Sequence, residues 1–84
     1  MSADTTTRIE TEVLGFVRER TGLELGATDD LFATGAVTSL FAMHLVTHVE
    51  QTYGVSVTGP LLKLDNFRSA SAVAALVTGL RQEP

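Results

Sequence analysis

The sequence predicts an all-α protein, a small four-helix bundle made of three main helices and one short helix. Three observations lead to this prediction. Apolar residues recur at helical spacing in three separate segments, and helix-capping residues stand where those segments begin and end. A single stretch, VSVTGP, alternates like a strand, and it finds no partner strand of comparable quality. The 84 residues are expected to form one domain, 1–84, with an ordered core at about 6–81.

The first helix is expected within TTTRIETEVLGFVRERTG, residues 5–22. Its core face carries Ile9, Val13, Phe16 and Val17, with Leu14 beside them. One of the residues Asp4 to Thr7 is expected to cap its start, and Gly22 to end it.

Residues 23–37, LELGATDDLFATGAV, predict a long loop. A loop of this length in a compact domain is usually functional or held down by buried side chains. The expected anchors are Leu23, Leu25, Leu31 and Phe32.

The second main helix is expected from Ser39 to Tyr53, with Gly54 as its stop. At 100° per residue, one stripe collects the side chains that would face the core, namely Ala42, Leu45, Val46, Val49 and Tyr53. The opposite face collects Leu40, His44, Thr47 and Gln51, while Phe41 and Met43 flank the stripe. The first turn therefore presents an apolar patch beside Ser39, unless the loop or the short helix covers it.

The last third of the chain predicts an extended segment, a short helical turn at Leu61 to Asn66, and a final helix capped by Ser69. Leu62 and Phe67 are expected to join the core. The final helix is expected to bury Val73, Leu76, Val77 and Leu80.

The composition excludes several classes of function. There are 10 Asp+Glu against 6 Lys+Arg, a net charge of −4, and no cluster of basic residues, which argues against binding to nucleic acid or to an anionic membrane. Cysteine is absent, so disulfides and cysteine-ligated metals are excluded. The polar N-terminus and the lack of a long apolar run predict no signal peptide and no membrane span. A cytoplasmic monomer is the expectation.

Two adjacent hydroxyl residues stand at the start of the second helix. Only one of them can be the N-cap. If Thr38 is the cap, Ser39 occupies the first helical position with its hydroxyl free. A phosphate attached there would meet free backbone N–H groups and the positive end of the helix dipole. Taken without its context, a serine at a helix start is more often a cap.

Other candidate sites are weaker. His44 and His48 are spaced as metal ligands on one helix face, but two ligands make a poor site, and solvated surface histidines are favoured. Asp29 and Asp30 could act as a carboxylate pair, although loop capping is favoured. A hydrolase using Ser39 lacks a histidine placed to activate it. We expect no catalytic residue and no metal.

The stretch DDLFATGAVTSLFAMHLV resembles the helix-entry motif of acyl carrier proteins. The matching residues are Asp30, Leu31, Phe32, Gly35, Ser39 and Leu40. The resemblance implies that Ser39 carries a covalent 4′-phosphopantetheine, whose thiol holds an acyl group as a thioester. It also implies a protein that is a substrate of enzymes and not an enzyme itself.

The same resemblance implies the partners. They are a phosphopantetheinyl transferase, acyl-loading and tailoring enzymes, and a polyketide synthase acyltransferase or ketosynthase, which would bind Thr38, Leu40, Phe41, Met43 and His44. The sequence departs from the family pattern in having Thr38 where an Asp usually precedes the serine, and in placing only Glu50 as an acid on the second helix.

A narrower resemblance concerns the cargo. SLFAMHLVTHVEQTYGVSV, followed by LDNFRSASAVAALV, is similar to free-standing polyketide carriers of glycerate-derived extender units, such as hydroxymalonyl and methoxymalonyl. A carrier for an amino acid or another small starter acid shares much of this pattern. An unmodified helical interaction domain that binds a partner through Leu40 and Met43 is the alternative from a different class.

Overall fold

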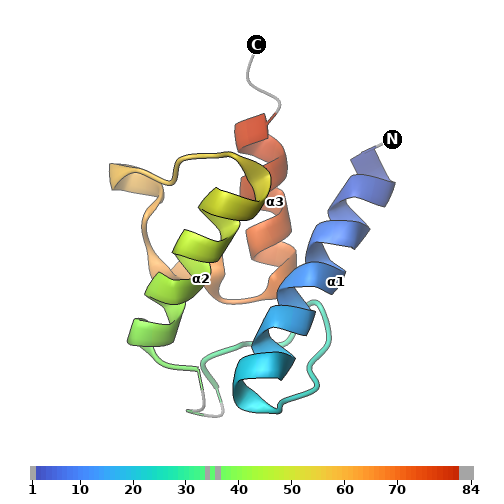
Figure 1. Ribbon diagram of the computed structural model, residues 1–84, viewed down its shortest axis with the longest axis vertical. Helices are drawn as coiled ribbons and strands as arrows, with labels where there is room; N and C mark the ends of the chain where they lie inside the picture. Colours follow the sequence, from blue (N-terminus) through green and yellow to red (C-terminus); the bar gives the residue numbers. More distant parts are fainter. Residues whose placement is uncertain (1, 34, 36, 82–84) are drawn as a thin grey trace.

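Over the residues that it describes, the computed structural model contains three α-helices and two short 3-10 turns (Figure 1). The helices are α1 (Ser2–Thr21), α2 (Ser39–Tyr53) and α3 (Ala70–Arg81), and the turns are η1 (Gly59–Leu61) and η2 (Leu64–Phe67). The structure describes residues 2–33, 35 and 37–81, so Thr34 and Ala36 of the predicted loop and residues 82–84 of the predicted domain lie outside the described residues. The all-α prediction is confirmed, although two consecutive 3-10 turns replace the single short helix.

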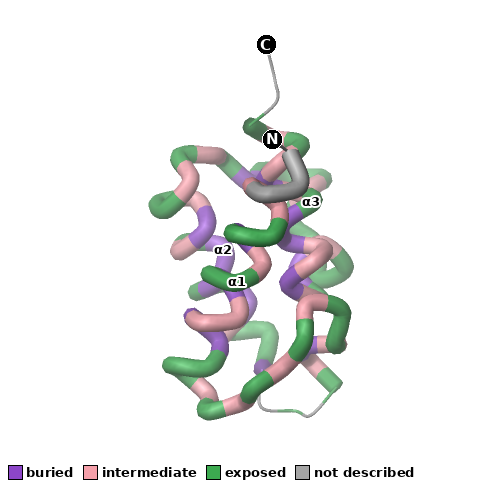
Figure 2. Tube along the Cα trace, turned by 90° about the vertical axis from the view of Figure 1, so that its right-hand side faces the viewer, coloured by how far each residue is buried: buried purple, intermediate pink, exposed green. Residues whose placement is uncertain are grey.

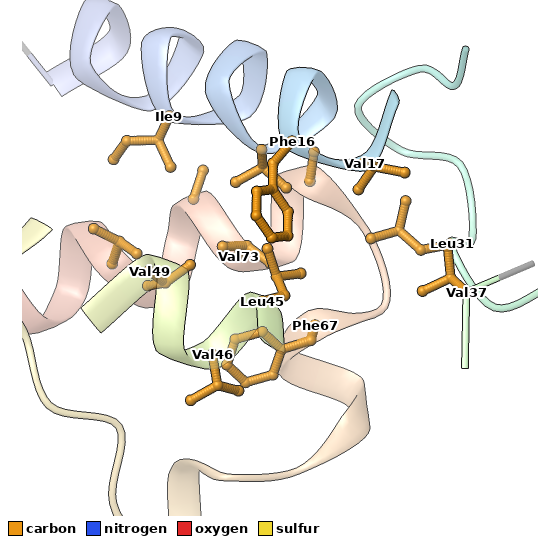
Figure 3. Close-up of a cluster of buried hydrophobic side chains, with 14 of the residues drawn as sticks. Ile9, Phe16, Val17, Leu31, Val37, Leu45, Val46, Val49, Phe67 and Val73 are labelled. Carbon is orange, nitrogen blue, oxygen red and sulfur yellow. The ribbon is translucent and has the colours of Figure 1, made fainter. Parts of the chain in front are cut away.

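The three helices enclose one apolar core to which every segment contributes (Figures 2 and 3). The predicted core face of α1 is buried, and so is the stripe of α2 except for Tyr53, which is partly buried. On α3 the prediction is partly wrong, because Leu76 and Leu80 are only partly buried whereas Ala70 and Ala74 are fully buried. Over the described residues, no helix is long and apolar enough to cross a membrane.

Helix α1 begins earlier than the sequence suggests and ends as predicted. Residues 4–7 lie inside the helix and not at its start, so the predicted cap at those positions is wrong. At the other end Gly22 adopts a φ of 79°, and its N–H donates to the Arg18 carbonyl at 2.8 Å. The left-handed conformation favours glycine, which explains the stop at this position.

The C-terminal end of α2 is fixed by backbone and side-chain contacts. Gly54 has a φ of 67° and donates its N–H to the Glu50 carbonyl at 3.0 Å, as expected for the predicted stop. The Glu50 carboxylate accepts a hydrogen bond from the Val57 N–H at 2.8 Å, which holds the extended segment against the helix. The Tyr53 hydroxyl donates to the carboxylate of Glu12 on α1, and burial together with this contact raises the pKa of Tyr53.

The long loop between α1 and α2 is anchored to the start of α3. Its Leu31 side chain is fully buried, and the Leu31 N–H donates to the Arg68 carbonyl at 2.7 Å. The Ser71 N–H in the first turn of α3 donates to the Ala27 carbonyl at 2.8 Å, so the loop satisfies an amide that has no partner within its own helix. Val37 is also buried, an anchor that the sequence analysis did not name.

Candidate functional site

The entrance of α2 assigns different roles to its two hydroxyl residues. Thr38 has extended backbone angles, and its Oγ1 accepts a hydrogen bond from the Phe41 N–H at 3.2 Å. The Thr38 carbonyl accepts a second bond, from the Ala42 N–H at 2.9 Å. Thr38 is therefore the N-cap, as predicted, and Ser39 is the first residue of the helix.

Ser39 is exposed at the positive end of the α2 dipole. The backbone N–H groups of Ser39 and Leu40 come before that of Phe41, which is the first N–H of the helix to bond to the cap. The first turn contains no acidic side chain. Within the described residues, no hydrogen bond engages the Ser39 hydroxyl. The arrangement leaves a reachable hydroxyl beside free N–H groups, which fits an attached phosphodiester.

A groove of about 270 Å³ opens beside Ser39, with α2 as one wall and the η1–η2 segment as the other. Figure 3 shows the Phe67 ring of η2 beside Val46 of α2, and both residues line the groove. The lining residues are Ser39, Ala42, Met43, Val46, Leu62, Lys63, Leu64 and Phe67. The mainly apolar lining of the groove, beside the Ser39 hydroxyl, fits a flexible organic chain.

Four large apolar side chains are exposed around the groove: Leu40 at 69%, Met43 at 49%, Leu62 at 44% and Leu64 at 45%. Exposure of Leu40 and Met43 was predicted from the helical wheel and is confirmed. The expectation that Leu62 joins the core is wrong. Leu62 lies between the two 3-10 turns, and it is Leu61, the last residue of η1, that packs against the core. This segment has no hydrophobic periodicity, so the sequence could not predict which of its leucines faces the core.

Phe41 and His48 contact α1 and are less available than the sequence analysis expected. The Phe41 ring centroid lies 5.6 Å from that of Phe16, and the His48 ring stacks on Phe16 at 4.2 Å. His48 is therefore partly buried by this stacking, whereas His44 is exposed as predicted. In the part of the chain that the structure describes, no three potential metal ligands come together.

The two loop carboxylates hold the backbone in place. Asp29 accepts the Gly26 N–H at 2.7 Å, and Asp30 accepts the Phe32 N–H at 2.9 Å. Arg68 bridges Asp30 and Asp65, with an N–O distance of 3.1 Å to each carboxylate. The Phe32 N–H first, and Arg68 in addition, hold the pKa of Asp30 below its ordinary value. These contacts agree with capping, the role that the sequence analysis favoured over acid–base chemistry.

Residues 11–77 match the family model described as the phosphopantetheine attachment site. The chain belongs to this family. Members are non-catalytic carrier domains that hold 4′-phosphopantetheine covalently on a serine, and they interact with phosphopantetheinyl transferases and acyl-processing enzymes. The predicted carrier role and cofactor are thus confirmed at family level. Comparisons with curated proteins and with solved structures gave no match.

Proposed function

We propose that Ser39 is the attachment residue and that this carrier domain serves a polyketide or related secondary-metabolite pathway. The observation that carries the proposal is the exposed Ser39 hydroxyl at the first position of α2, next to a separate residue that caps the helix. A transferase would join Ser39 Oγ to the phosphate of the arm from coenzyme A. The thiol at the far end of the arm would then carry the acyl group as a thioester.

The other serines of the matched segment fit this role less well. Ser69 Oγ accepts the Ala72 N–H at 3.1 Å and caps α3, and Ser71 Oγ donates to Glu10 at 2.9 Å. Ser56 is exposed, but it lies in the extended segment after α2 and not at a helix N-terminus. Ser39 alone among these four combines an exposed hydroxyl with the start of an α-helix.

The test is coexpression with a broad-specificity phosphopantetheinyl transferase, followed by mass spectrometry of the intact protein. We expect one added phosphopantetheine on the wild type and on Ser56→Ala, and none on Ser39→Ala. Circular dichroism of Ser39→Ala should stay helical because Thr38 provides the cap. Modification of Ser39→Ala would show that another residue carries the arm.

The proposed partner surface surrounds Ser39 and consists of Thr38, Leu40, Phe41, Met43 and His44. Leu40 and Met43 offer apolar area, His44 and Thr38 are exposed polar residues, and Phe41 offers only the part of its ring that α1 leaves uncovered. Because the first turn of α2 has no acid, we expect binding of loading enzymes, acyltransferases or ketosynthases to depend weakly on salt.

We further propose a glycerate-derived, three-carbon acyl unit as the cargo, supported by the sequence resemblance around Ser39–Met43 and Asp65–Ser69. A physical argument predicts where such a unit resides. Burial of an alkyl chain gains about 0.8 kcal/mol per CH₂, but a short hydroxylated unit has little to gain and would lose hydration of its hydroxyl. The unit should therefore remain in solvent.

Comparison of holo, glyceryl-loaded and octanoyl-loaded protein by NMR tests this point. The glyceryl form should match the holo form at Leu45, Val46 and Phe67, whereas the octanoyl chain should shift these buried residues. Large shifts with the glyceryl unit would refute the solvent-exposed cargo. Loading of an amino acid but of no glycerate-derived unit by the cognate enzyme would replace the cargo assignment.

A further inference from the structure

Among the residues that the structure describes, Lys63 is the only cationic side chain that lines the groove containing Ser39. The other basic residues are engaged elsewhere or line other surfaces. Arg68 pairs with Asp30 and Asp65, and Arg20 lies over the Phe16 ring at 4.7 Å. Arg8 and Arg81 line a hollow near Tyr53, and Arg18 lines one between α1 and the long loop.

The backbone of Lys63 is fixed on the groove wall that faces α2. Its N–H donates to the Leu61 carbonyl and its carbonyl accepts the Asn66 N–H, both at 3.0 Å. The Asn66 side-chain amide closes the same turn by donating to the Leu61 carbonyl at 2.7 Å. The buried Phe67 then anchors the segment in the core. The fold therefore fixes the position of the Lys63 backbone, while the flexible side chain allows the ammonium group to move.

Lys63 is not paired with an acidic side chain in the described part of the chain. None of the described residues that line the groove is acidic, and the neighbouring Asp65 is paired with Arg68. Its aliphatic stem can lie along the apolar wall between Leu62 and Leu64 while the ammonium group stays in water. An exposed cation so placed beside an attachment site fits an anionic ligand.

We propose that Lys63 binds the phosphodiester of the arm attached to Ser39. The inference rests on the proposed attachment at Ser39. The phosphodiester is the charged group of the arm nearest the protein, and the α2 N-terminus would approach it from one wall while Lys63 approaches it from the other. Lys63 would be a positioning residue that directs the arm across the groove toward η1 and η2, and not outward along α2.

The experiment uses NMR on apo and holo wild type, Lys63→Met, Lys63→Arg and the matched control Arg18→Met. Addition of the arm should shift the Lys63 side-chain Cε–Hε resonance of the wild type. The ³¹P resonance of the holo protein should change in Lys63→Met, stay close to wild type in Arg18→Met, and be largely restored in Lys63→Arg. The difference between wild type and Lys63→Met should shrink by about half or more between ~0.05 and ~0.5 M salt, as expected for an exposed ion pair.

Several outcomes would overturn the proposal. One is a Lys63 resonance unchanged by the arm, a measurement that needs no variant to fold. Another is a ³¹P resonance that is identical in all four proteins. A Lys63 shift that appears only after loading of a carboxylate-bearing acyl unit would assign the lysine to the cargo and not to the phosphodiester. Absence of the arm from Ser39 in the mass spectrum would instead refute the proposed function itself.

Discussion

At the scale of single residues, the two adjacent hydroxyl side chains at the entrance of α2 have different roles. Thr38 Oγ1 accepts the hydrogen bond from the Phe41 N–H, so the Ser39 hydroxyl is not needed to cap the helix. In a sequence where an Asp precedes the serine, the same cap would also place a negative charge next to the proposed attachment residue. Thr38 keeps the cap and omits that charge, so the first turn presents an uncompensated helix dipole.

Replacement of Thr38 tests this separation. Thr38→Ala should lower the free energy of unfolding by about 1 kcal/mol, the usual value of an N-cap hydrogen bond. Thr38→Asp should preserve or raise it, because an acid at the cap also interacts with the helix dipole. Urea unfolding followed by circular dichroism measures both. Ser39→Ala is the control and should change stability by less than about 0.5 kcal/mol; a larger loss would show that Ser39 shares the capping role.

At the scale of elements, α2 has one buried face and one exposed face. Two consecutive residues, Ala42 and Met43, lie on different faces. Ala42 is 4% exposed and Met43 is 49% exposed. Ala42→Glu should cost about 3 kcal/mol or more, because it buries a charge with no partner. Met43→Glu should leave the thermal transition near wild type while impairing acyl transfer with partner enzymes. A strongly destabilised Met43→Glu would mean that Met43 contributes to the core after all.

Gly15, inside α1, is not required by close packing or by its backbone conformation. A Cβ built at Gly15 meets nothing within 4 Å, and its φ is not positive. Gly15→Ala should therefore raise the free energy of unfolding by about 0.5–1 kcal/mol through helix propensity.

Gly54 is the matched contrast to Gly15. A Cβ there also meets nothing nearby, but L-residues with a side chain rarely adopt a φ of 67°. Gly54→Ala should destabilise by about 1–2 kcal/mol in the same urea titration. Equal effects at the two glycines would contradict this assignment.

At the scale of the whole molecule, Asp30 and Arg68 tie the long loop to the segment before α3. The pKa of Asp30 is held below its ordinary value of 3.8 in the folded protein. A lowered carboxyl pKa adds stability above the unfolded-state pKa, and that contribution is lost as the pH falls through the folded-state pKa. Asp30→Asn should therefore be less stable than wild type at pH 7, and the difference should shrink below about pH 4.

Thermal unfolding from pH 7 to pH 3 measures this convergence. The effect should be modest, because both side chains are partly exposed and water screens the pair. Asp29→Asn is a useful comparison, since the Asp29 carboxylate contacts only a nearby backbone N–H within its loop. A gap between wild type and Asp30→Asn that stays constant down to pH 3 would show that the lost contact is not electrostatic.

The limits of prediction from sequence follow from the nature of each signal. Helical periodicity located the buried stripe of α2 and the exposure of Leu40 and Met43, and Gly22 and Gly54 marked two helix ends. The groove could not be predicted, because its second wall is a short irregular segment without periodicity. The partial burial of His48 was missed for a related reason, because it depends on Phe16, a residue of another helix.

Tyr53 gives the protein an optical probe of known location. The chain has one tyrosine and no tryptophan, so fluorescence excited at wavelengths that phenylalanine does not absorb originates from a single ring. That ring is on the last residue of α2, about 21 Å along the helix axis from Ser39, and its hydroxyl donates to Glu12 on α1. Emission therefore reports whether α1 and α2 remain joined at that end. Emission should be insensitive to chemistry at Ser39, at the other end of α2. It can therefore be used to follow unfolding of the apo, holo and loaded protein alike.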